Sequence, residues 1–359
     1  MPESTQKIRL RLSPQAERYA RRDAPRDVRL MASRGALPLP PIELATVLFA
    51  LMHDPDPEVK STARESLEGL PEPICSSVLS GETHPAILAH LAHAFCETEA
   101  KLEKIALNSA ASDDTIAFLA SLPFKRIVEI VSNNQDRLLR SSALVEALGE
   151  NPLTGRSVID RILAFLGVDP APVESAPTQD GEDGPISDEA AEAALRAVLG
   201  EDMGHLAQEL VRETDTPIEE IDSGNLFGMI QAMTVMQKIK LARMGNREAR
   251  ALLIRDRNKL VAMAAVMSPK NTVQDISKVA NARNVSDEIL RVIARNREWT
   301  RDYPVKLALA SNPKTPIPEA MKFVNYLHDR DLYTLMRSRD VPTAIATHAR
   351  RNLMKKGKL

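Results

Sequence analysis

The sequence is poor in cysteine and in long apolar runs, and each shortage excludes a class of protein. Its two cysteines, Cys75 and Cys96, allow at most one disulfide, which excludes a disulfide-stabilised secreted scaffold and fits a reducing compartment. The first residues, MPESTQKIRLRLSP, contain no apolar core, so no signal peptide is expected. Apolar stretches such as residues 42–52 are too short to span a bilayer. The sequence therefore predicts a cytoplasmic protein without a transmembrane segment.

Aromatic residues are scarce, at 3% of the chain with a single Trp. Sheets depend on β-branched and aromatic side chains, whereas the abundant Ala and Leu favour helices. The sequence also lacks a glycine-rich phosphate loop, an H-E-x-x-H zinc motif and a G-x-S-x-G nucleophile motif. We therefore expect an all-α, non-enzymatic protein with no catalytic residues, no metal and no cofactor.

Charge is distributed unevenly although the chain carries a net charge of only −2. Residues 169–224 carry a net charge of −14, and residues 225–359 carry +15. Residues 168–188 are rich in Pro, Asp, Glu, Gly and Ser, a composition that favours disorder. We predict an N-terminal helical array over residues 1–167, an acidic flexible linker over 168–188 and a basic helical array over 189–359. One hypothesis is that residues 169–224 fold back and mask the basic array.

Short polar motifs recur at nearly constant intervals. Ser268-Pro269-Lys270-Asn271-Thr272 returns as Ser311-Asn312-Pro313-Lys314-Thr315, with Ser268 and Asn312 separated by 44 positions. Asn108 and Asn151 are separated by 43. Proline disfavours helix in the residue before it, and Ser, Thr, Asn and Asp cap the next helix. Repeats of this length, built from short helices, predict an α-solenoid, in which each repeat packs on its neighbours. Further helix starts are expected at five caps and one proline: Asn246, Asn258, Ser286, Asp302, Asp329 and Pro342.

A family resemblance rests on two segments of the sequence. Val305–Pro316 (VKLALASNPKTP) resembles the leucine-rich-repeat-variant unit, and Asp54–Arg64 (DPDPEVKSTAR) resembles the start of the second helix of a HEAT repeat. The array from about Gln237 onward is similar to uncharacterised bacterial HEAT-like proteins. The resemblance implies a HEAT/armadillo-like α-solenoid with a curved interaction surface and no activity. Some variant-repeat proteins carry a cysteine cluster for an iron–sulfur centre, and this chain has none.

The densest group of metal-ligand residue types is His84, His90, His93 and Cys96, with Cys75 as a further donor. Zinc uses such donors. However, the spacing of His90, His93 and Cys96 drifts around a helix, and no C-x-x-C pair anchors it. The alternative is a half-buried helix face with polar edges, and we predict no metal there.

Basic side chains in residues 225–359 are the main candidates for contact with a partner. Lys240, Arg243, Arg247 and Arg250 have a helical spacing, although Gly245 and Asn246 are expected to split the stripe. Such charge suits an acidic protein surface, phosphates of nucleic acid or anionic lipid heads, or it forms only a solvated surface. We favour a protein partner of unknown identity and keep nucleic acid as the alternative. The sequence does not predict an oligomeric state.

A second candidate is the segment Arg297–Tyr303 (REWTRDY), which contains the only Trp. Trp, Tyr and Arg dominate interface hot spots, so we include Arg295, Arg297, Trp299, Arg301 and Tyr303 among the partner-binding candidates. The alternative is that Trp299 fills the core between two repeats. Met229, Met233 and Met236 similarly suit either an adaptable docking face or a core.

Overall fold

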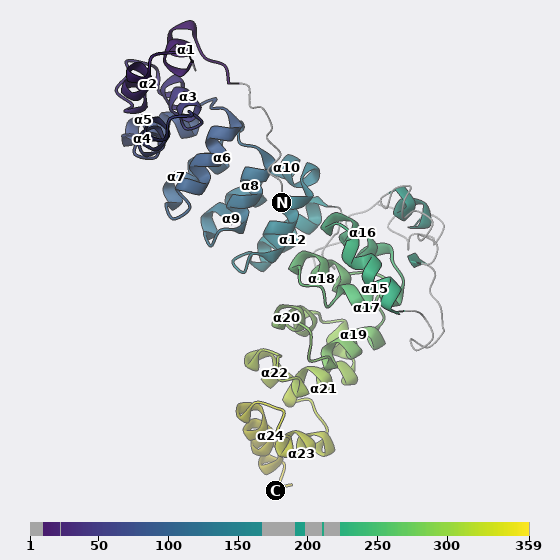
Figure 1. Cartoon of the computed structure of the whole chain (residues 1–359). Coiled ribbons are helices and arrows are strands. Elements are labelled where there is room, and N and C mark those ends of the chain that lie inside the picture. The colour runs from purple at the N-terminus through teal and green to yellow at the C-terminus, as the bar shows by residue number, and fades with distance from the viewer. Residues whose placement is uncertain (1–9, 22, 167–190, 198–209, 212–222, 359) are drawn as a thin grey trace, which may run out of the picture. The chain divides into compact units, whose positions relative to one another are not determined.

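The computed structural model describes residues 10–21, 23–166, 191–197, 210–211 and 223–358 (Figure 1). Every regular element in these ranges is a helix, so the all-α prediction is confirmed for the described chain. The predicted linker, residues 168–188, and most of the acidic stretch 169–224 lie outside the described residues. The fold-back hypothesis therefore stays a prediction.

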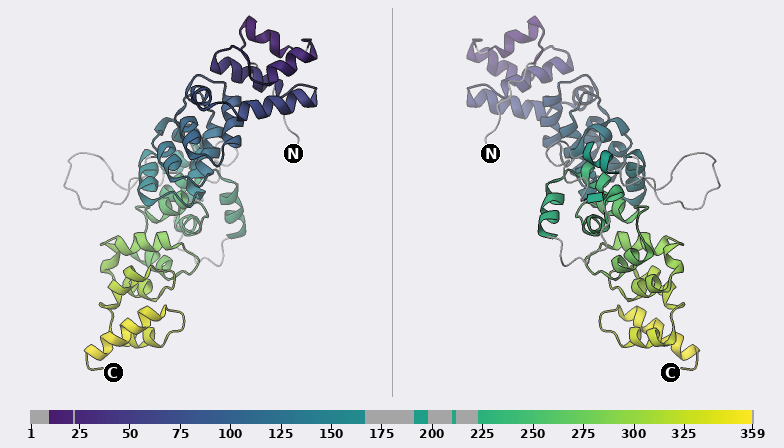
Figure 2. Two further views of the ribbon diagram at one scale, coloured as in Figure 1. Left: turned by 90° about the vertical axis from the view of Figure 1, so that its left-hand side faces the viewer. Right: turned by 90° about the vertical axis from the view of Figure 1, so that its right-hand side faces the viewer.

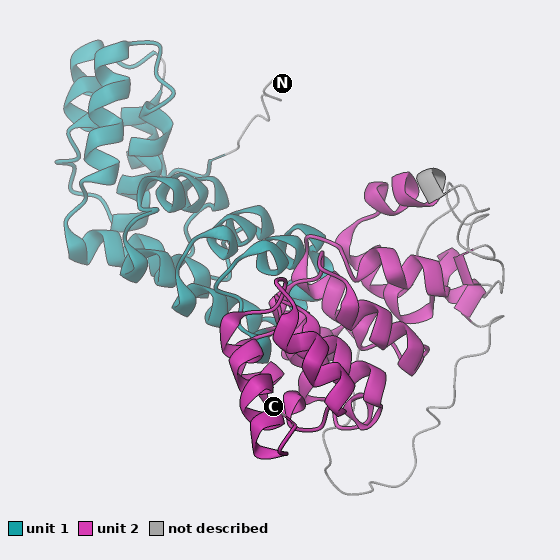
Figure 3. Ribbon diagram, turned by 90° about the horizontal axis from the view of Figure 1, so that it is seen from below, with its two compact units in different colours: residues 1–158 teal, residues 159–359 magenta. Residues whose placement is uncertain are grey.

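The chain divides into two compact units, unit 1 over residues 1–158 and unit 2 over residues 159–359 (Figure 3). The helices of unit 1 are α1 (Pro14–Ala20), α2 (Arg26–Ser33), α3 (Pro41–Leu51), α4 (Pro57–Glu68), α5 (Glu72–Ser80), α6 (Pro85–Ala94), α7 (Glu99–Leu107), α8 (Asp113–Ser121), α9 (Lys125–Ser132), α10 (Gln135–Arg140) and α11 (Ser142–Glu150). Helix α12 (Arg156–Phe165) contains the division between the units.

Unit 2 is built from helices of similar length. They are α15 (Ser223–Ala232), α16 (Val235–Met244), α17 (Arg247–Leu253), α18 (Lys259–Val266), α19 (Val273–Asn281), α20 (Asp287–Arg295), the 3-10 helix η2 (Trp299–Arg301), α21 (Tyr303–Ser311), α22 (Ile317–Val324), α23 (Asp329–Arg337) and α24 (Thr343–Lys355). Within each unit the colour changes steadily along the ribbon, so helices that are consecutive in sequence are neighbours (Figure 2).

Most of the expected helix starts are found, and they have a local cause. The side chains of Asn246, Asn258 and Ser286 accept hydrogen bonds from the first turns of α17, α18 and α20. Two expected starts are wrong by one residue. Asp329 is the first helical residue of α23 rather than its cap, and Pro342 precedes α24 instead of opening it, because its backbone is extended. Asp302 occupies the cap position of α21 without a side-chain bond.

Four helix pairs pack together although the two helices of each pair are not consecutive in sequence. Helix α5 packs on α7, α8 on α11, α16 on α18 and α19 on α21. Apolar side chains close each interface, as Val305 and Leu309 of α21 illustrate with fully buried side chains. Burial of these faces is the main stabilising term, since helices of this length are marginal on their own in water.

A buried asparagine joins the two helix ends in three of these pairs. It follows the last residue of the second helix, and its side-chain amide donates to two carbonyls at the end of the first helix. Its side-chain oxygen accepts the N–H two residues later. We call this arrangement the asparagine clamp. The clamps are Asn108 to the carbonyls of Leu79 and Gly81 (2.7 and 2.8 Å), Asn151 to those of Ala120 and Leu122 (2.6 and 2.9 Å), and Asn312 to those of Ala280 and Ala282 (2.7 and 3.0 Å).

In the fourth pair, α16 and α18, a serine takes the place of the asparagine. The hydroxyl of Ser268 donates to the carbonyl of Arg243 at the end of α16 (3.2 Å). Ser268 therefore occupies the position that the repeat pattern assigns to Asn312, but it makes one bond where the asparagine makes two. Gly245 and Gly81 end the equivalent helices α16 and α5. A Cβ on either glycine would lie 2.5 to 2.8 Å from the carbonyl four residues earlier, so a side chain does not fit there.

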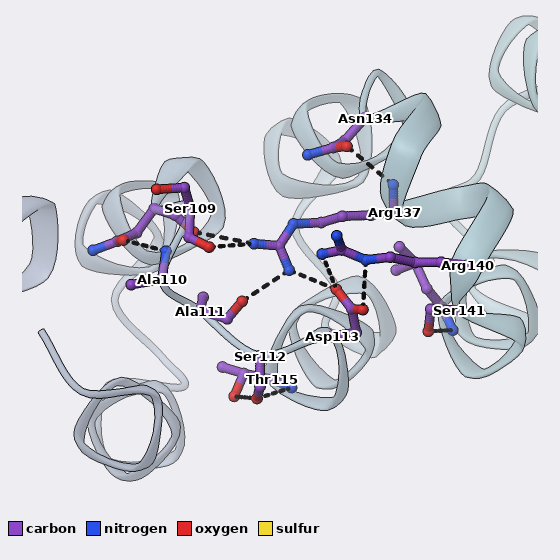
Figure 4. Close-up of polar contacts among 12 residues, drawn as sticks. Ser109, Ala110, Ala111, Ser112, Asp113, Thr115, Asn134, Arg137, Arg140 and Ser141 are labelled. Carbon is purple, nitrogen blue, oxygen red and sulfur yellow. Dashed lines mark hydrogen bonds and ion pairs between the residues drawn. The ribbon is translucent and has the colours of Figure 1, made fainter. Parts of the chain in front are cut away.

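A buried arginine secures the loop after the first clamp (Figure 4). Arg137 of α10 is 5% exposed. Its guanidinium donates to the carbonyls of Ala111 (2.8 Å), Ser109 (3.1 Å) and Asn108 (3.4 Å), and to the carboxylate of Asp113 (2.7 Å). Asp113 also receives two bonds from the exposed Arg140. One side chain thus fixes the connection between α7 and α8.

Candidate partner-binding surface

The cationic stripe Lys240, Arg243, Arg247 and Arg250 is split, as expected, between two helices. Helix α16 ends at Met244 and α17 begins at Arg247, with Gly245 and Asn246 between them. Lys240 is exposed and Arg243 is half-buried. The four side chains therefore do not form one continuous row on a single helix.

The two α17 arginines make different contacts. Arg247 is exposed and forms an ion pair with Asp275 of α19. Arg250 is 2% exposed, so it does not share the solvent-facing surface. Its guanidinium donates to the carbonyl of Gly245 (2.8 Å), the carbonyl of Lys270 (3.1 Å) and the side-chain oxygen of Asn271 (3.1 Å). Arg250 thereby connects α17 to the loop before α19, much as Arg137 acts in unit 1.

The second candidate group surrounds η2. Arg295, Arg297 and Arg301 are exposed, and Trp299 is half-buried, so its ring belongs neither fully to the core nor fully to the surface. Arg295 pairs with Glu319 of α22 at 3.7 Å. The backbone carbonyl of Arg301 accepts a bond from the Lys306 ammonium (3.0 Å).

Tyr303 connects this segment to α23. Its hydroxyl donates to the carboxylate of Asp331 and accepts the backbone N–H of His328 at 3.0 Å. Its ring stacks on the His328 ring, with 4.4 Å between centroids. Burial, followed by the hydrogen bond to the Asp331 carboxylate, raises the pKa of Tyr303. Tyr303 therefore fixes the segment and keeps its proton at neutral pH.

The structure contains a cavity of about 320 Å³ that sequence reasoning missed. It lies between α17 and α19, with Leu226 of α15 also lining it. No local pattern identifies it, because its lining comes from segments up to 59 positions apart, from Leu226 to Val285. Arg247 and Arg250 line it, so two of the sequence candidates share this site.

The three methionines proposed as a docking face do not lie on one helix. Helix α15 ends at Ala232 and α16 begins at Val235, so Met229 and Met236 belong to different helices. Met233, between them, is 5% exposed and contributes to the core.

The metal-ligand residue types of unit 1 are dispersed among separate roles. The His84 ring accepts the N–H of Ala86 and caps α6, the His90 ring contacts Glu68 at 3.1 Å, and the His93 ring lies on Phe118. Cys75 and Cys96 are both free thiols, and burial raises the pKa of Cys75. Within the described residues, no three His, Cys, Asp or Glu side chains are grouped to hold a metal ion.

Unit 1 is expected to lose stability as the pH falls below about 6.5, partly through His90. Burial lowers the pKa of His90 below its ordinary 6.5, against the opposing effect of Glu68. The unfolded chain therefore binds the proton more tightly, and the stabilising contribution, present above pH 6.5, is lost on acidification. His90→Gln should flatten this pH dependence, measured by hydrogen exchange of α4 and α6 peptides. Glu68→Gln should steepen it, and a parallel response of both variants would contradict this account.

None of the helices among the described residues combines the length and apolar character needed to cross a membrane.

Comparison of the chain with protein-family models, with curated proteins and with solved structures gives no significant match. The family resemblance therefore stays a prediction, and any function has to be inferred from the chain's own residues.

Proposed function

We propose that this protein is a HEAT/armadillo-like α-solenoid that acts as a non-enzymatic scaffold for another protein. The observation that carries the proposal is the recurrence of the same connection between paired helices. Three asparagine clamps and the shorter Ser268 bond occupy equivalent positions in four helix pairs. In α-solenoid proteins each repeat contacts only the neighbouring repeats, and the stacked repeats present an extended surface to partners.

Unit 2 is the part we assign to partner contact. The exposed cations of this unit that form no side-chain ion pair with any described residue include Lys240, Arg255, Lys278, Arg301 and Lys314. Unpaired exposed charge steers association with a surface of opposite charge at little cost in stability. An acidic protein surface is therefore the favoured partner, in the cytoplasm.

Site-specific photo-crosslinking tests the scaffold proposal. The full chain carries p-benzoylphenylalanine at Lys240 or Arg301 in unit 2, or at the exposed Lys60 in unit 1 as the matched control. We expect one or a few defined proteins to crosslink to the unit 2 positions in cells and not to Lys60. Equal, diffuse crosslinking at all three positions would contradict the assignment.

Nucleic-acid binding is the alternative function, and the net charge of +15 on residues 225–359 favours it. A mobility shift with arbitrary duplex DNA and RNA separates the two functions. Tight binding that weakens steeply between low and moderate salt would support the alternative. We expect no such shift at about 150 mM salt. The 3% aromatic content also offers little surface for stacking bases of single strands.

A further inference from the structure

The cavity between α17 and α19 combines an apolar interior with a positively charged entrance. Its apolar lining is formed by Leu226, Ala251, Leu252, Ile254, Val279 and Val285. Ile254 and Val285 are buried, whereas Leu226, Ala251, Leu252 and Val279 are half-buried and remain partly open to solvent. A volume of about 320 Å³ lies at the small end of ligand sites, which suits an anchoring side chain.

The charges around the cavity do not cancel. Four cationic side chains and two carboxylates line it, so its formal net charge is +2. Asp275 is already engaged by Arg247 and by the Thr272 hydroxyl. Burial raises the pKa of Asp275, but the bonds from Thr272 and Arg247 outweigh this and lower it, so the carboxylate is ionised at neutral pH. Arg255 and Lys278 are exposed and form no ion pair with the described part of the chain.

The walls of the cavity are fixed before any ligand arrives. Arg250 holds α17 to the following loop through the carbonyls of Gly245 and Lys270 and the side chain of Asn271. Asn271 in turn donates to the carbonyls of Ala265 and Val266, both at 2.8 Å. A site whose walls are already ordered loses less conformational entropy on binding.

We propose that this cavity is the docking site for an acidic peptide segment of the protein partner. One large apolar side chain of the segment enters between α17 and α19, and flanking carboxylates pair with Arg255 and Lys278. The proposal rests on the scaffold function above and specifies its partner. Charge complementarity selects this occupant, because a basic segment would meet a site of its own sign.

Fluorescence anisotropy of labelled peptides on the full chain tests the docking site. The probe is the peptide EELLEE in one-letter code, and the controls are EESSEE, which lacks the apolar anchor, and KKLLKK, which reverses the charge. At about 150 mM salt we expect EELLEE to bind and both controls to bind at least about tenfold more weakly. Methyl resonances of Ile254 and Val279 should shift on titration with EELLEE.

Two double variants with the same change in charge separate the site from general attraction. Arg255→Glu with Lys278→Glu should weaken EELLEE binding by at least about tenfold. Lys60→Glu with Lys125→Glu, which alters two exposed cations of unit 1, should change it by less than about twofold. Ala251→Phe fills the cavity and should abolish the methyl shifts, and an unchanged thermal unfolding midpoint would show that the variant folds.

Equal binding of EELLEE and EESSEE, or equal loss in the two double variants, would overturn the docking site and leave only non-specific attraction. If EELLEE fails to bind while crosslinking at Lys240 still recovers a defined partner, the docking site is wrong and the scaffold function stands. If EELLEE binds with the expected pattern while crosslinking recovers no partner, the scaffold function fails independently of the cavity, and the docking site then belongs to another function.

Discussion

Replacement of Arg137 by Met should lower the unfolding free energy of unit 1 by about 3 kcal/mol. Arg137→Met keeps most of the apolar volume of the side chain but removes every donor. Three backbone carbonyls between Asn108 and Ala111 then lose a partner in a region where Arg137 itself is only 5% exposed. A buried polar group that loses its hydrogen-bond partner destabilises the fold by far more than an exposed hydrogen bond stabilises it.

Arg140→Met is the matched control, since both arginines bind the same carboxylate. The Arg140 side chain is 56% exposed and the Arg137 side chain 6%. Exposed ion pairs contribute little, so Arg140→Met should cost about 0 to 1 kcal/mol. Urea unfolding gives the total change, and hydrogen exchange of a peptide covering residues 105–115 locates it. Equal losses in the two variants would show that the ion pair with Asp113, rather than the three carbonyl bonds, carries the effect.

The same cluster predicts an acid dependence with a defined sign. Hydrogen bonds from Arg140 and then Arg137 hold the pKa of Asp113 below its ordinary 3.8. A lowered pKa adds stability above the unfolded value and loses it as the pH falls through the folded value. Unit 1 should therefore weaken below about pH 4, and this loss should be smaller in Arg137→Met.

Much of the helical organisation could be predicted because its signals are local. Asn246, Asn258 and Ser286 cap helices through bonds to residues two or three positions away, and such spacings are visible in the sequence. The two errors are also local. His328 is the residue before α23 but makes no side-chain cap bond, and Pro342 is extended before α24 begins, a position that prolines also occupy before α3 and α22.

The candidate site was harder to predict because it depends on packing between helices. Lys240 and Arg250 belong to the same sequence stripe, yet one is exposed and the other is 2% exposed, since the loop before α19 covers the α17 guanidinium. The cavity likewise requires α15, α17 and α19 to meet. No periodicity within one segment encodes such a meeting, so Lys278 did not stand out among the other exposed lysines.

Replacement of Asn312 by Ala should lower the unfolding free energy of unit 2 by about 2 to 3 kcal/mol. The change leaves the carbonyls of Ala280 and Ala282 without their amide donor and removes the acceptor for the Lys314 N–H. Asn312 is 4% exposed, so water does not readily replace these bonds. Hydrogen exchange of peptides from the ends of α19 and α21 should rise in the variant.

Asn281→Ala is the matched control in the same unit, because Asn281 is exposed and its amide donates to a carbonyl of its own helix. It should change stability by no more than about 0.5 kcal/mol. Asn312→Asp is more informative still. It keeps the acceptor but places a carboxylate against two carbonyls, so its cost at neutral pH should exceed that of Ala and decrease on acidification.

If the clamp is the repeated element of this architecture, its cost should recur wherever it occurs. Asn108→Ala and Asn151→Ala should each destabilise unit 1 about as much as Asn312→Ala destabilises unit 2, since all three asparagines are buried and make the same three bonds. Ser268→Ala removes a single bond and should cost about 1 kcal/mol. A large loss at Asn312 alone would mean that the three clamps are similar in geometry without being equivalent in energy, and the repeat would then rest on the apolar faces of the paired helices.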